Sequence, residues 1–455
     1  MTMKHIYLSL LVFAVGTISC RKFVEVEQPN QRQFKYTADF QRLLNNMSLF
    51  ESSAALPMLS SDDINLESNT SLQNQLTNEL GNIYTWAADY YTSDQNDAGW
   101  DQLYNQIYVC NQVTANVMAS TDGSMEQKRH VYAEAQTQRA ATYLTLINLY
   151  ARVYNASNAA ADPGLPLLLS PDLQVPLNRA SVKQVYDQII KDLTEALPQL
   201  PDHPSYNFHP GKAAGYGLLA RTYLYMQRYS EAADNAAKAL GVQSTLLDLN
   251  DYADGKNAYP RRLDNAEVIL GKKAGKPGYL DLPLSTELLN RLTPEDLRYQ
   301  LFTRAGSTFL PSFTGRGSYR DKIFMGDNVS VGISVPEMML TQAEGLARAG
   351  RKDDAMALVN KLRQKRFRPA QYAVLTAASN DEALRIVIDE RRRELFGTGL
   401  RWFDQRRLSM EPALMETVTR VFKGVTYTLK PGDRYVYPIP PKNIELNPEL
   451  TQNQR

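Results

Sequence analysis

Apolar residues recur at helical spacing in the first half of the chain. In residues 100–118 and 128–154 the apolar positions lie three or four residues apart. Ser181 opens a third such segment, where a serine can cap the first helical turn, and Pro198 stands near its end. This periodicity predicts amphipathic helices over 100–118, 128–154 and 181–197.

Two later segments follow the tetratricopeptide pattern. In Gly211–Leu240, the small residue Ala220 is followed three positions later by Tyr223, and alanine recurs further along. The pattern returns in Glu337–Arg363, where Gly350 occupies the position of the turn between two helices. Such helix pairs bury a continuous core only by stacking on one another. We therefore expect a mostly α-helical fold of tetratricopeptide-like helix pairs, over about 100–155, 181–240 and 337–368.

Two long segments between these helices lack the periodicity. Residues 51–99 are rich in Ser, Asn, Asp and Gln, whereas residues 246–334 are rich in Gly and Pro and contain several aromatic residues. Loops of this length are uncommon inside compact proteins and often carry function. We expect the helices to form the scaffold of a single domain, residues 20–455, and the two loop-rich inserts to carry the ligand site.

The N-terminus has the features of a secretory signal. Lys4 precedes an apolar run that ends at Ile18 and is shorter than the ~20 apolar residues that span a bilayer. Ser19 stands directly before Cys20, and bacterial lipoprotein signals are cut before a cysteine whose thiol receives a diacylglycerol. We predict that residues 1–19 are removed and that acyl chains such as palmitate on Cys20 anchor the mature chain.

Composition and charge argue against a nucleic-acid partner. Apolar residues make up 43% of the chain and charged residues 22%, which is ordinary for a globular protein. The formal net charge is +1, and removal of Lys4 with the signal leaves the mature chain near neutral. Cys110 has no partner for a disulfide once Cys20 is lipidated, and its place in a helical pattern predicts a buried thiol.

No catalytic or metal-binding motif stands out in the sequence. The chain has no His-Glu-x-x-His motif, and His203 and His209 lie in a proline-rich turn without a third ligand nearby. Carboxylates are plentiful, but no pair is marked as the acid and base of a glycosidase. The sequence therefore predicts a non-enzymatic protein without a cofactor, and a glycoside hydrolase on the same scaffold is an alternative.

A charged motif near the C-terminus is the most informative segment. Residues 389–407 read DERRRELFGTGLRWFDQRR. Helical spacing allows ion pairs of Arg393 with Glu390 or Asp389. Glycines at 397 and 399 permit a tight turn, and the aromatic residues beside them can pack inside. We assign this motif to fold integrity and not to an active site.

The motif closely resembles the C-terminal signature of the SusD/RagB family. Further stretches resemble the family in the same order and extend over nearly the whole mature chain: Cys20–Pro29, Trp100–Tyr104, Gln138–Tyr150, Gly164–Leu167 and Ala343–Arg363. The resemblance implies an outer-membrane lipoprotein, facing the cell exterior, that caps a SusC-like TonB-dependent transporter. It also implies that the protein delivers an oligosaccharide to that barrel. A peptide-binding subunit of the RagB type and a tetratricopeptide-like assembly scaffold are alternatives.

The inserts supply candidate ligand-binding residues. Sugar rings stack on flat aromatic side chains, and glycan-binding members of the family use exposed aromatics in their inserts. We therefore predict aromatic contacts from Trp86, Tyr84, Tyr90, Tyr279, Phe313 and Tyr319, and polar contacts from Asp62, Asp63 and Asn65. Trp86 is the leading candidate because it lies in a polar, weakly periodic stretch.

Overall fold

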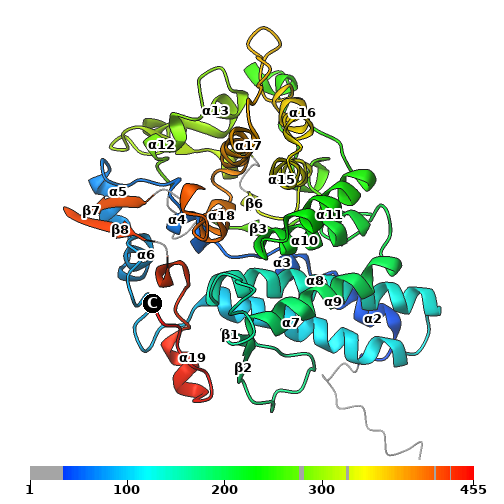
Figure 1. Cartoon of the computed structure of the whole chain (residues 1–455). Coiled ribbons are helices and arrows are strands. Elements are labelled where there is room, and N and C mark those ends of the chain that lie inside the picture. Colours follow the sequence, from blue (N-terminus) through cyan, green and yellow to red (C-terminus); the bar gives the residue numbers. More distant parts are fainter. Residues whose placement is uncertain (1–33, 276–280, 324–326, 415–416, 431) are drawn as a thin grey trace, which may run out of the picture.

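The structure is mostly α-helical, which confirms the fold class predicted from the apolar periodicity. The computed structural model describes residues 34–275, 281–323, 327–414, 417–430 and 432–455 (Figure 1). Its long helices are α7 (Ala98–Asn116), α8 (Met125–Tyr150), α9 (Val182–Ala196), α10 (Lys212–Tyr225), α11 (Tyr229–Val242), α15 (Val335–Arg348), α16 (Lys352–Arg363), α17 (Asn380–Leu395) and α18 (Leu400–Leu408).

The ends of several helices follow from local sequence signals. Ser181 caps α9: its hydroxyl accepts a hydrogen bond from the backbone N–H of Gln184 at 3.2 Å, and the Gln184 side chain accepts one from the backbone N–H of Ser181. Gly350 lies between α15 and α16 with a φ of +81°. This left-handed conformation favours glycine, and the turn between the two helices is where the repeat pattern predicts it.

Consecutive helices pack side by side along most of the chain. α7 packs on α8, α8 on α9, α9 on α10 and α10 on α11. The next neighbour of α11 is α15, although residues 243–334 separate them in the sequence (Figure 1). The approach is close at Gly345, where a Cβ atom would lie 2.5 Å from the Tyr229 carbonyl oxygen. The helix pairs therefore form one continuous stack, and the second insert leaves the stack and returns to it.

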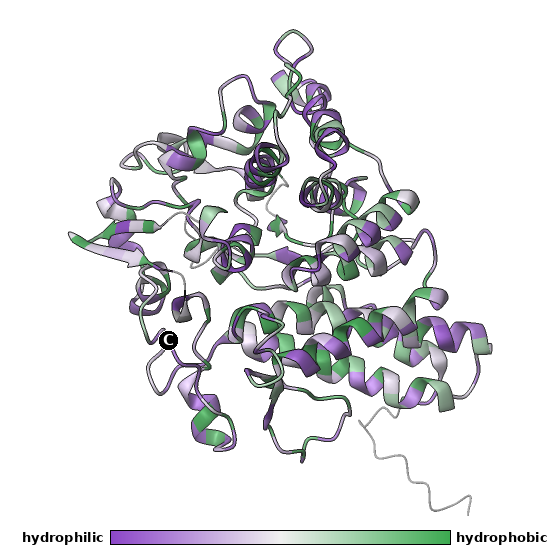
Figure 2. Cartoon of the chain, in the orientation of Figure 1, coloured by the Kyte–Doolittle hydropathy of each residue, from purple (hydrophilic) through white to green (hydrophobic). Residues whose placement is uncertain are grey.

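Most of the long helices bury an apolar face in the core, whereas α8 and α10 are buried on nearly all sides. Hydrophilic and hydrophobic residues alternate along the long helices in Figure 2. Cys110 is fully buried on α7, as predicted, and burial raises the pKa of its thiol to about 12. In the described part of the chain, no helix carries an apolar stretch long enough to cross a bilayer.

The two inserts consist of short elements. The first contains α4 (Leu56–Ser60), α5 (Thr70–Gln75) and α6 (Asn78–Tyr84). The second contains α12 (Thr286–Leu289), α13 (Leu297–Phe302), α14 (Arg320–Ile323) and the antiparallel pairs β3 (Lys273–Ala274) with β6 (Val329–Ser330) and β4 (Thr303–Ala305) with β5 (Arg316–Ser318). The other short elements are α2 (Thr37–Leu44), α3 (Met47–Phe50), the pair β1 (Pro163–Pro166) and β2 (Arg179–Ser181), and α19 (Pro441–Leu446).

A β-hairpin after the charged motif reaches back to the first insert. It pairs β7 (Val418–Phe422) with β8 (Val425–Leu429) in antiparallel register. Its two turn residues, Lys423 and Gly424, both have positive φ values, as the tight two-residue turn of a hairpin requires. In Figure 1 this hairpin lies beside α5 and α6, so segments from both ends of the chain meet on one side of the molecule.

Candidate functional site

The charged motif forms a buried ion-pair network on α17 and α18. Arg391 donates from Nε to Asp404 at 2.8 Å, and Arg407 donates from Nη1 to Glu344 on α15 at 2.6 Å. All four side chains are at least nine-tenths buried. A buried charge that loses its partner is strongly destabilising, so each pair has to be complete in the folded state. This network supports the assignment of the motif to fold integrity.

Two glutamates of α17 connect the motif to the second insert. Glu394 pairs with Arg366 at 2.9 Å and with Arg298 at 2.7 Å. Burial opposes ionisation of this carboxyl group, but Arg366 and Arg298 outweigh it and lower the pKa of Glu394 from 4.5 to about 2. Glu390 pairs with Arg393 at 2.8 Å, as the helical spacing predicts.

The predicted pair of Asp389 with Arg393 is wrong. Asp389 pairs with Arg291, which follows α12, at 3.0 Å. Arg393 is instead bound by Glu390 one turn earlier on its own helix. The second insert supplies the competing arginine, and the helical spacing of α17 alone gives no information about it.

Asp62 and Asp63 follow α4 and are held by the charged motif. Arg401 donates from Nε and Nη2 to the two carboxylate oxygens of Asp62, at 2.7 and 2.8 Å. Arg392 donates from Nε to Asp63 at 2.9 Å. The backbone N–H of Asp62 donates to the side-chain oxygen of Gln405 at 3.1 Å. These bonds fix the turn that carries both aspartates against α17 and α18.

The second insert holds the other edge of this segment. The backbone N–H of Asn65 donates to the Pro283 carbonyl at 3.1 Å, and that of Ser285 donates to the Asp63 carbonyl at 2.7 Å. Three parts of the chain that are distant in sequence therefore meet at the Asp62–Asn65 segment: the first insert, the second insert and the charged motif.

The two adjacent aspartates have opposite pKa shifts. Burial disfavours the charged form of Asp62, but Arg401 and Arg392 outweigh burial, so the pKa of Asp62 lies below its ordinary value. At Asp63 burial prevails over Arg392 and raises the pKa. Asp62 is therefore a fixed negative charge at neutral pH, and both of its oxygens already bind arginine.

A polar pocket of about 80 Å³ opens beside this segment. We call it the acceptor pocket, because most of its polar lining side chains carry oxygen acceptors: Asp62, Asn65, Ser285, Glu287, Thr417 and Thr419. Arg392 and Arg420 also line it. Glu287, Thr417 and Thr419 are exposed at its rim. Carboxylate, amide and hydroxyl oxygens suit a ligand with many hydroxyl groups.

A second pocket of about 210 Å³ also has Arg392 in its lining. We call it the arginine pocket. Its charged lining residues are Arg291, Arg385, Asp389, Arg392 and Arg401. Arg392 lines both pockets, so the two are neighbours.

The three aromatic residues predicted around Trp86 are buried, which corrects the expectation that they form an exposed platform. Trp86, Tyr84 and Tyr90 are 3%, 0% and 1% exposed. The indole N–H of Trp86 donates to the Ser60 carbonyl at 2.9 Å. Arg420 covers the Trp86 and Tyr84 rings, with its guanidinium carbon 4.3 and 4.2 Å from their centres. No face of these rings is free for a sugar.

The end of α6 explains why Trp86 points inward. Trp86 has a φ of +52°, and the backbone N–H of Ala87 donates to the Asn82 carbonyl at 2.8 Å. This is a helix C-terminal motif whose left-handed position usually holds glycine. The turn places the bulky Trp86 side chain in the core. The polar residues around Trp86 in the sequence suggest instead that it is exposed.

Phe313 and Tyr319, two further predicted aromatic residues, line neither the acceptor pocket nor the arginine pocket. Phe313 is 3% exposed and packs on Phe309. Tyr319 is half-buried, with the Arg304 guanidinium 4.5 Å from its ring centre. Tyr279 and Cys20 lie outside the described residues. Of the eight predicted ligand residues that the structure describes, only Asp62 and Asn65 line the acceptor pocket, while Asp63 is buried and lies outside the lining.

Sequence reasoning missed the other polar residues of the acceptor pocket. Ser285, Glu287 and Thr419 come from short segments with no motif, and only the fold brings them beside Asp62. Arg392 was assigned to the fold alone, yet it also lines both pockets. The one signal available was the unusual number of arginines in residues 389–407.

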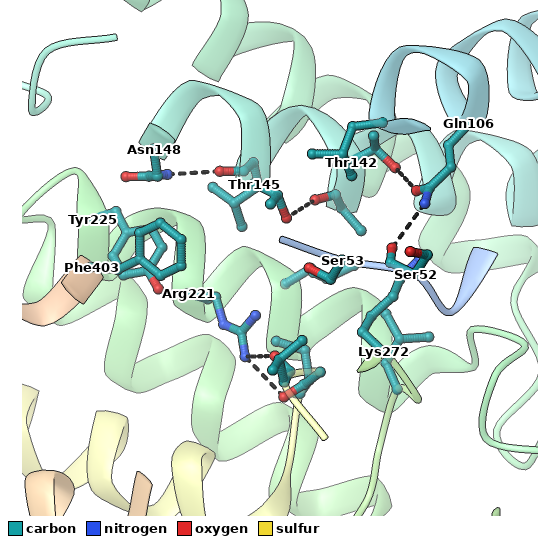
Figure 3. A pocket seen from close by; sticks show the side chains of 18 residues that line it. Ser52, Ser53, Gln106, Thr142, Thr145, Asn148, Arg221, Tyr225, Lys272 and Phe403 are labelled. Carbon is teal, nitrogen blue, oxygen red and sulfur yellow. Dashed lines mark hydrogen bonds between the residues drawn. The ribbon is translucent and has the colours of Figure 1, made fainter. Parts of the chain in front are cut away.

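A third cavity lies inside the helix stack and is too small for a sugar (Figure 3). Its volume is about 30 Å³, about the share of one water molecule in the liquid. Lys272 lines it, and its ammonium group donates to the side-chain oxygen of Gln138 at 2.7 Å. Burial lowers the pKa of Lys272 to about 8. Among the described residues, no group of three or more His, Cys, Asp or Glu is arranged to hold a metal ion.

Two family models match the chain. A model described as "Starch-binding associating with outer membrane" matches residues 22–224, and a model described as "SusD family" matches residues 335–455. The first match includes the Asp62–Asn65 segment and the second includes the charged motif.

Two curated relatives match shorter segments. SusD-like protein P38 of Formosa agariphila is 30% identical over 122 residues, which are 26% of this chain and 22% of that protein. SusD-like protein P2 of the same organism is 27% identical over 162 residues, which are 36% of this chain and 30% of that protein. The matched segments span less than a third of the length of either relative.

Solved structures match over nearly the whole chain. A SusD superfamily protein from Bacteroides thetaiotaomicron has a TM-score of 0.76 at 20% identity, covering 92% of this chain and 100% of that one. A SusD-like carbohydrate binding protein from Bacteroides vulgatus gives 0.68 at 20% identity, with 92% and 98% covered. A laminarin binding SusD-like protein gives 0.64 at 17% identity, with 92% and 99% covered. At these identities the likeness establishes the fold.

Proposed function

The chain belongs to the SusD/RagB family, and from that premise we propose that it captures an oligosaccharide at the acceptor pocket and delivers it to a SusC-like TonB-dependent transporter. Proteins of this family bind ligands and associate with the outer membrane. We propose that acyl chains on Cys20 hold this chain there, on the side facing the cell exterior.

The observation that carries the proposal is the lining of the acceptor pocket. Oxygen acceptors from both inserts and the β7–β8 hairpin converge there, and several stand exposed at the rim. Sugar hydroxyl groups can donate to the exposed oxygens of Glu287, Thr417 and Thr419. A peptide ligand would favour an enclosed cavity lined by backbone donors, and the acceptor pocket is lined by polar side chains instead. The pocket therefore supports an oligosaccharide over a peptide.

The same geometry supports a binding role over catalysis. A glycosidase needs one carboxyl group that gives up a proton and a second that acts as base or nucleophile. Asp62 is ionised, and Arg401 binds both of its oxygens, so it has no proton to give. Asp63 is 1% exposed and lies outside the lining of the pocket. Among the described lining residues this leaves Glu287 as the one carboxyl group that no arginine side chain holds, and a single free carboxyl group does not make the pair. We propose that the protein binds its ligand without cleaving it.

The test is binding of a broad oligosaccharide panel to the purified chain, followed by analysis of the bound sugars for cleavage products. We expect at least one oligosaccharide to bind and to be recovered intact. Binding of peptides in place of sugars would favour the RagB-type alternative, and cleavage products would indicate an enzyme.

The transporter partner is tested separately. A tagged chain isolated from native outer membranes in mild detergent should carry a TonB-dependent barrel in near-equal amount. Recovery of the intact chain without a barrel would favour the scaffold alternative.

A further inference from the structure

The arginine pocket has a chemistry that the proposed function does not use. We infer that it binds an acidic group, a carboxylate or a sulfate, of the captured oligosaccharide, so that the preferred ligand is an acidic glycan. This inference rests on the proposed function and specifies its substrate class. It depends on four features: the charge balance of the lining, one arginine without a partner, an unsatisfied donor on α18 and the position of the pocket.

The lining of the arginine pocket has more cationic groups than anionic groups. Four arginines and a single aspartate, Asp389, are its charged members. Arg401 is bound by Asp62, Arg392 by Asp63 and Arg291 by Asp389. These pairs hold three guanidinium groups in place at the wall of the pocket. Asp62 and Asp63 lie outside the lining of the arginine pocket. The polar part of its wall therefore presents mainly N–H donors to a ligand.

Arg385 is the arginine that lacks a partner. It is exposed on α17, one helical turn before Asp389, and forms no ion pair or hydrogen bond with any residue in the described ranges. An anion that entered the pocket would meet this guanidinium group without displacing a carboxylate from it. Guanidinium groups bind carboxylates and other oxyanions through two parallel hydrogen bonds, which makes arginine selective for such ligands.

Gln405 adds an unsatisfied donor to the same wall. Its side-chain oxygen accepts the backbone N–H of Asp62, which fixes the orientation of the amide because a backbone N–H can donate only to oxygen. Its side-chain nitrogen, Nε2, is buried and has no hydrogen-bond partner among the described residues. Buried donors are usually satisfied, so this nitrogen is available to an acceptor that a ligand brings into the pocket.

The position and size of the pocket suit one unit of a longer glycan. Its volume of about 210 Å³ is enough for a single sugar with its substituent and too small for an extended chain. Because Arg392 lines both pockets, one oligosaccharide can place a neutral unit among the acceptors and an acidic unit among the arginines. The hydroxyl oxygens of a neutral glycan can also accept from these donors, but a carboxylate or sulfate forms charge-assisted hydrogen bonds with guanidinium groups, which are stronger.

The experiment compares matched ligands on matched variants. The probes are an oligogalacturonide, the same oligosaccharide with its carboxyl groups reduced to hydroxymethyl groups, and a sulfated neutral oligosaccharide. The variants are Arg385→Ala and, as a control, Arg129→Ala. Arg129 is also exposed on a helix but lines neither pocket. Neither side chain has a partner in the described structure, so both variants should fold normally.

We expect at least one acidic probe to bind about tenfold or more tightly than the reduced probe, with an advantage that decreases at higher salt. Arg385→Ala should remove most of that advantage, and Arg129→Ala should keep it. A preference for the uronate or for the sulfated probe identifies which acidic group the pocket selects. Equal binding of acidic and reduced probes, or an advantage unchanged in Arg385→Ala, would overturn the inference and leave oligosaccharide capture intact. Failure of every sugar to bind would overturn the proposed function itself.

Discussion

Asp62 and Arg401 form a two-point ion pair between distant parts of the chain. Both carboxylate oxygens of Asp62 accept hydrogen bonds from Arg401, at 2.7 and 2.8 Å, although 339 positions separate the two residues. Their side chains are only 10% and 14% exposed. The pair joins the first insert to the charged motif and forms part of the wall between the acceptor pocket and the arginine pocket.

Asp62→Asn should destabilise the fold. The substitution keeps the shape of the side chain but leaves Arg401 and Arg392 without its charge. Removing one partner of a buried pair costs about 3 kcal/mol or more, so we expect the free energy of unfolding to fall by that amount in urea denaturation. Asp353→Asn is the matched control, because Asp353 also pairs with a cation, Lys352, but is 91% exposed. An exposed pair contributes at most about 1 kcal/mol, and similar losses in the two variants would contradict this account.

Glu394→Gln should change the pH dependence of stability. The pKa of Glu394 is lowered from 4.5 to about 2, so its stabilising effect is complete above about pH 5 and is lost as the pH falls toward 2. The loss of unfolding free energy caused by Glu394→Gln should therefore be larger at pH 7 than at pH 3, by about 1 kcal/mol or more. Glu126→Gln, at an exposed position on α8, should cause a difference that hardly depends on pH. A pH-independent loss for Glu394→Gln would show that its charge is not what stabilises the fold.

Lys272 should titrate well below an ordinary lysine. Burial lowers its pKa from 10.5 to about 8. In ¹³C-lysine-labelled protein, one Cε resonance should move near pH 8, and Lys272→Met should lack it. Between pH 8 and 10.5 the unfolded chain holds more protons than the folded chain, so the unfolding free energy should rise with pH relative to Lys272→Met. If every lysine signal in the wild-type protein titrates near 10.5, burial does not lower the pKa of Lys272 and this prediction is wrong.

Gly345→Ala should disturb the contact of α11 with α15. The new Cβ atom would lie 2.5 Å from the Tyr229 carbonyl oxygen and 2.6 Å from the Ala233 Cβ atom. Overpacking of this kind costs about 1–3 kcal/mol of unfolding free energy. Gly241→Ala, also in a helix, meets no atom within 4 Å and should stabilise the protein by up to about 1 kcal/mol. Thermal unfolding of both variants distinguishes the two effects, and a neutral Gly345→Ala would argue against the direct stacking of these helices.

The helices could be predicted from the sequence because their signals are local. Apolar spacing located α7, α8 and α9, and the repeat pattern located the pairs α10–α11 and α15–α16. Ser181 marked the start of α9, and Gly350 marked the turn between α15 and α16. The buried state of Cys110 followed from the same spacing. In each case the residues that determine the feature lie within a few turns of one another.

The site could be predicted only in part because it depends on long-range contacts. Asp62 and Asn65 were chosen as polar residues in an insert, and both line the acceptor pocket. Trp86 was chosen by the same reasoning, but a left-handed turn at the end of α6 places its ring under Arg420. The sequence near Trp86 lacks the glycine that usually marks such a turn. Arg420 is distant in the sequence, so its contact with Trp86 could not be predicted locally.

The most direct test of the account is calorimetric titration of the tightest oligosaccharide from the panel into Asn65→Ala/Thr419→Ala. Both residues line the acceptor pocket, and Asn65 makes one side-chain hydrogen bond, to the backbone N–H of Glu67, so the double variant should lose little stability. Thr426→Ala, at an exposed position on the same hairpin outside the pocket, is the control. We predict an affinity loss of about tenfold or more in the double variant and none in the control. Unchanged affinity in the double variant would show that the oligosaccharide binds elsewhere and would contradict the central claim.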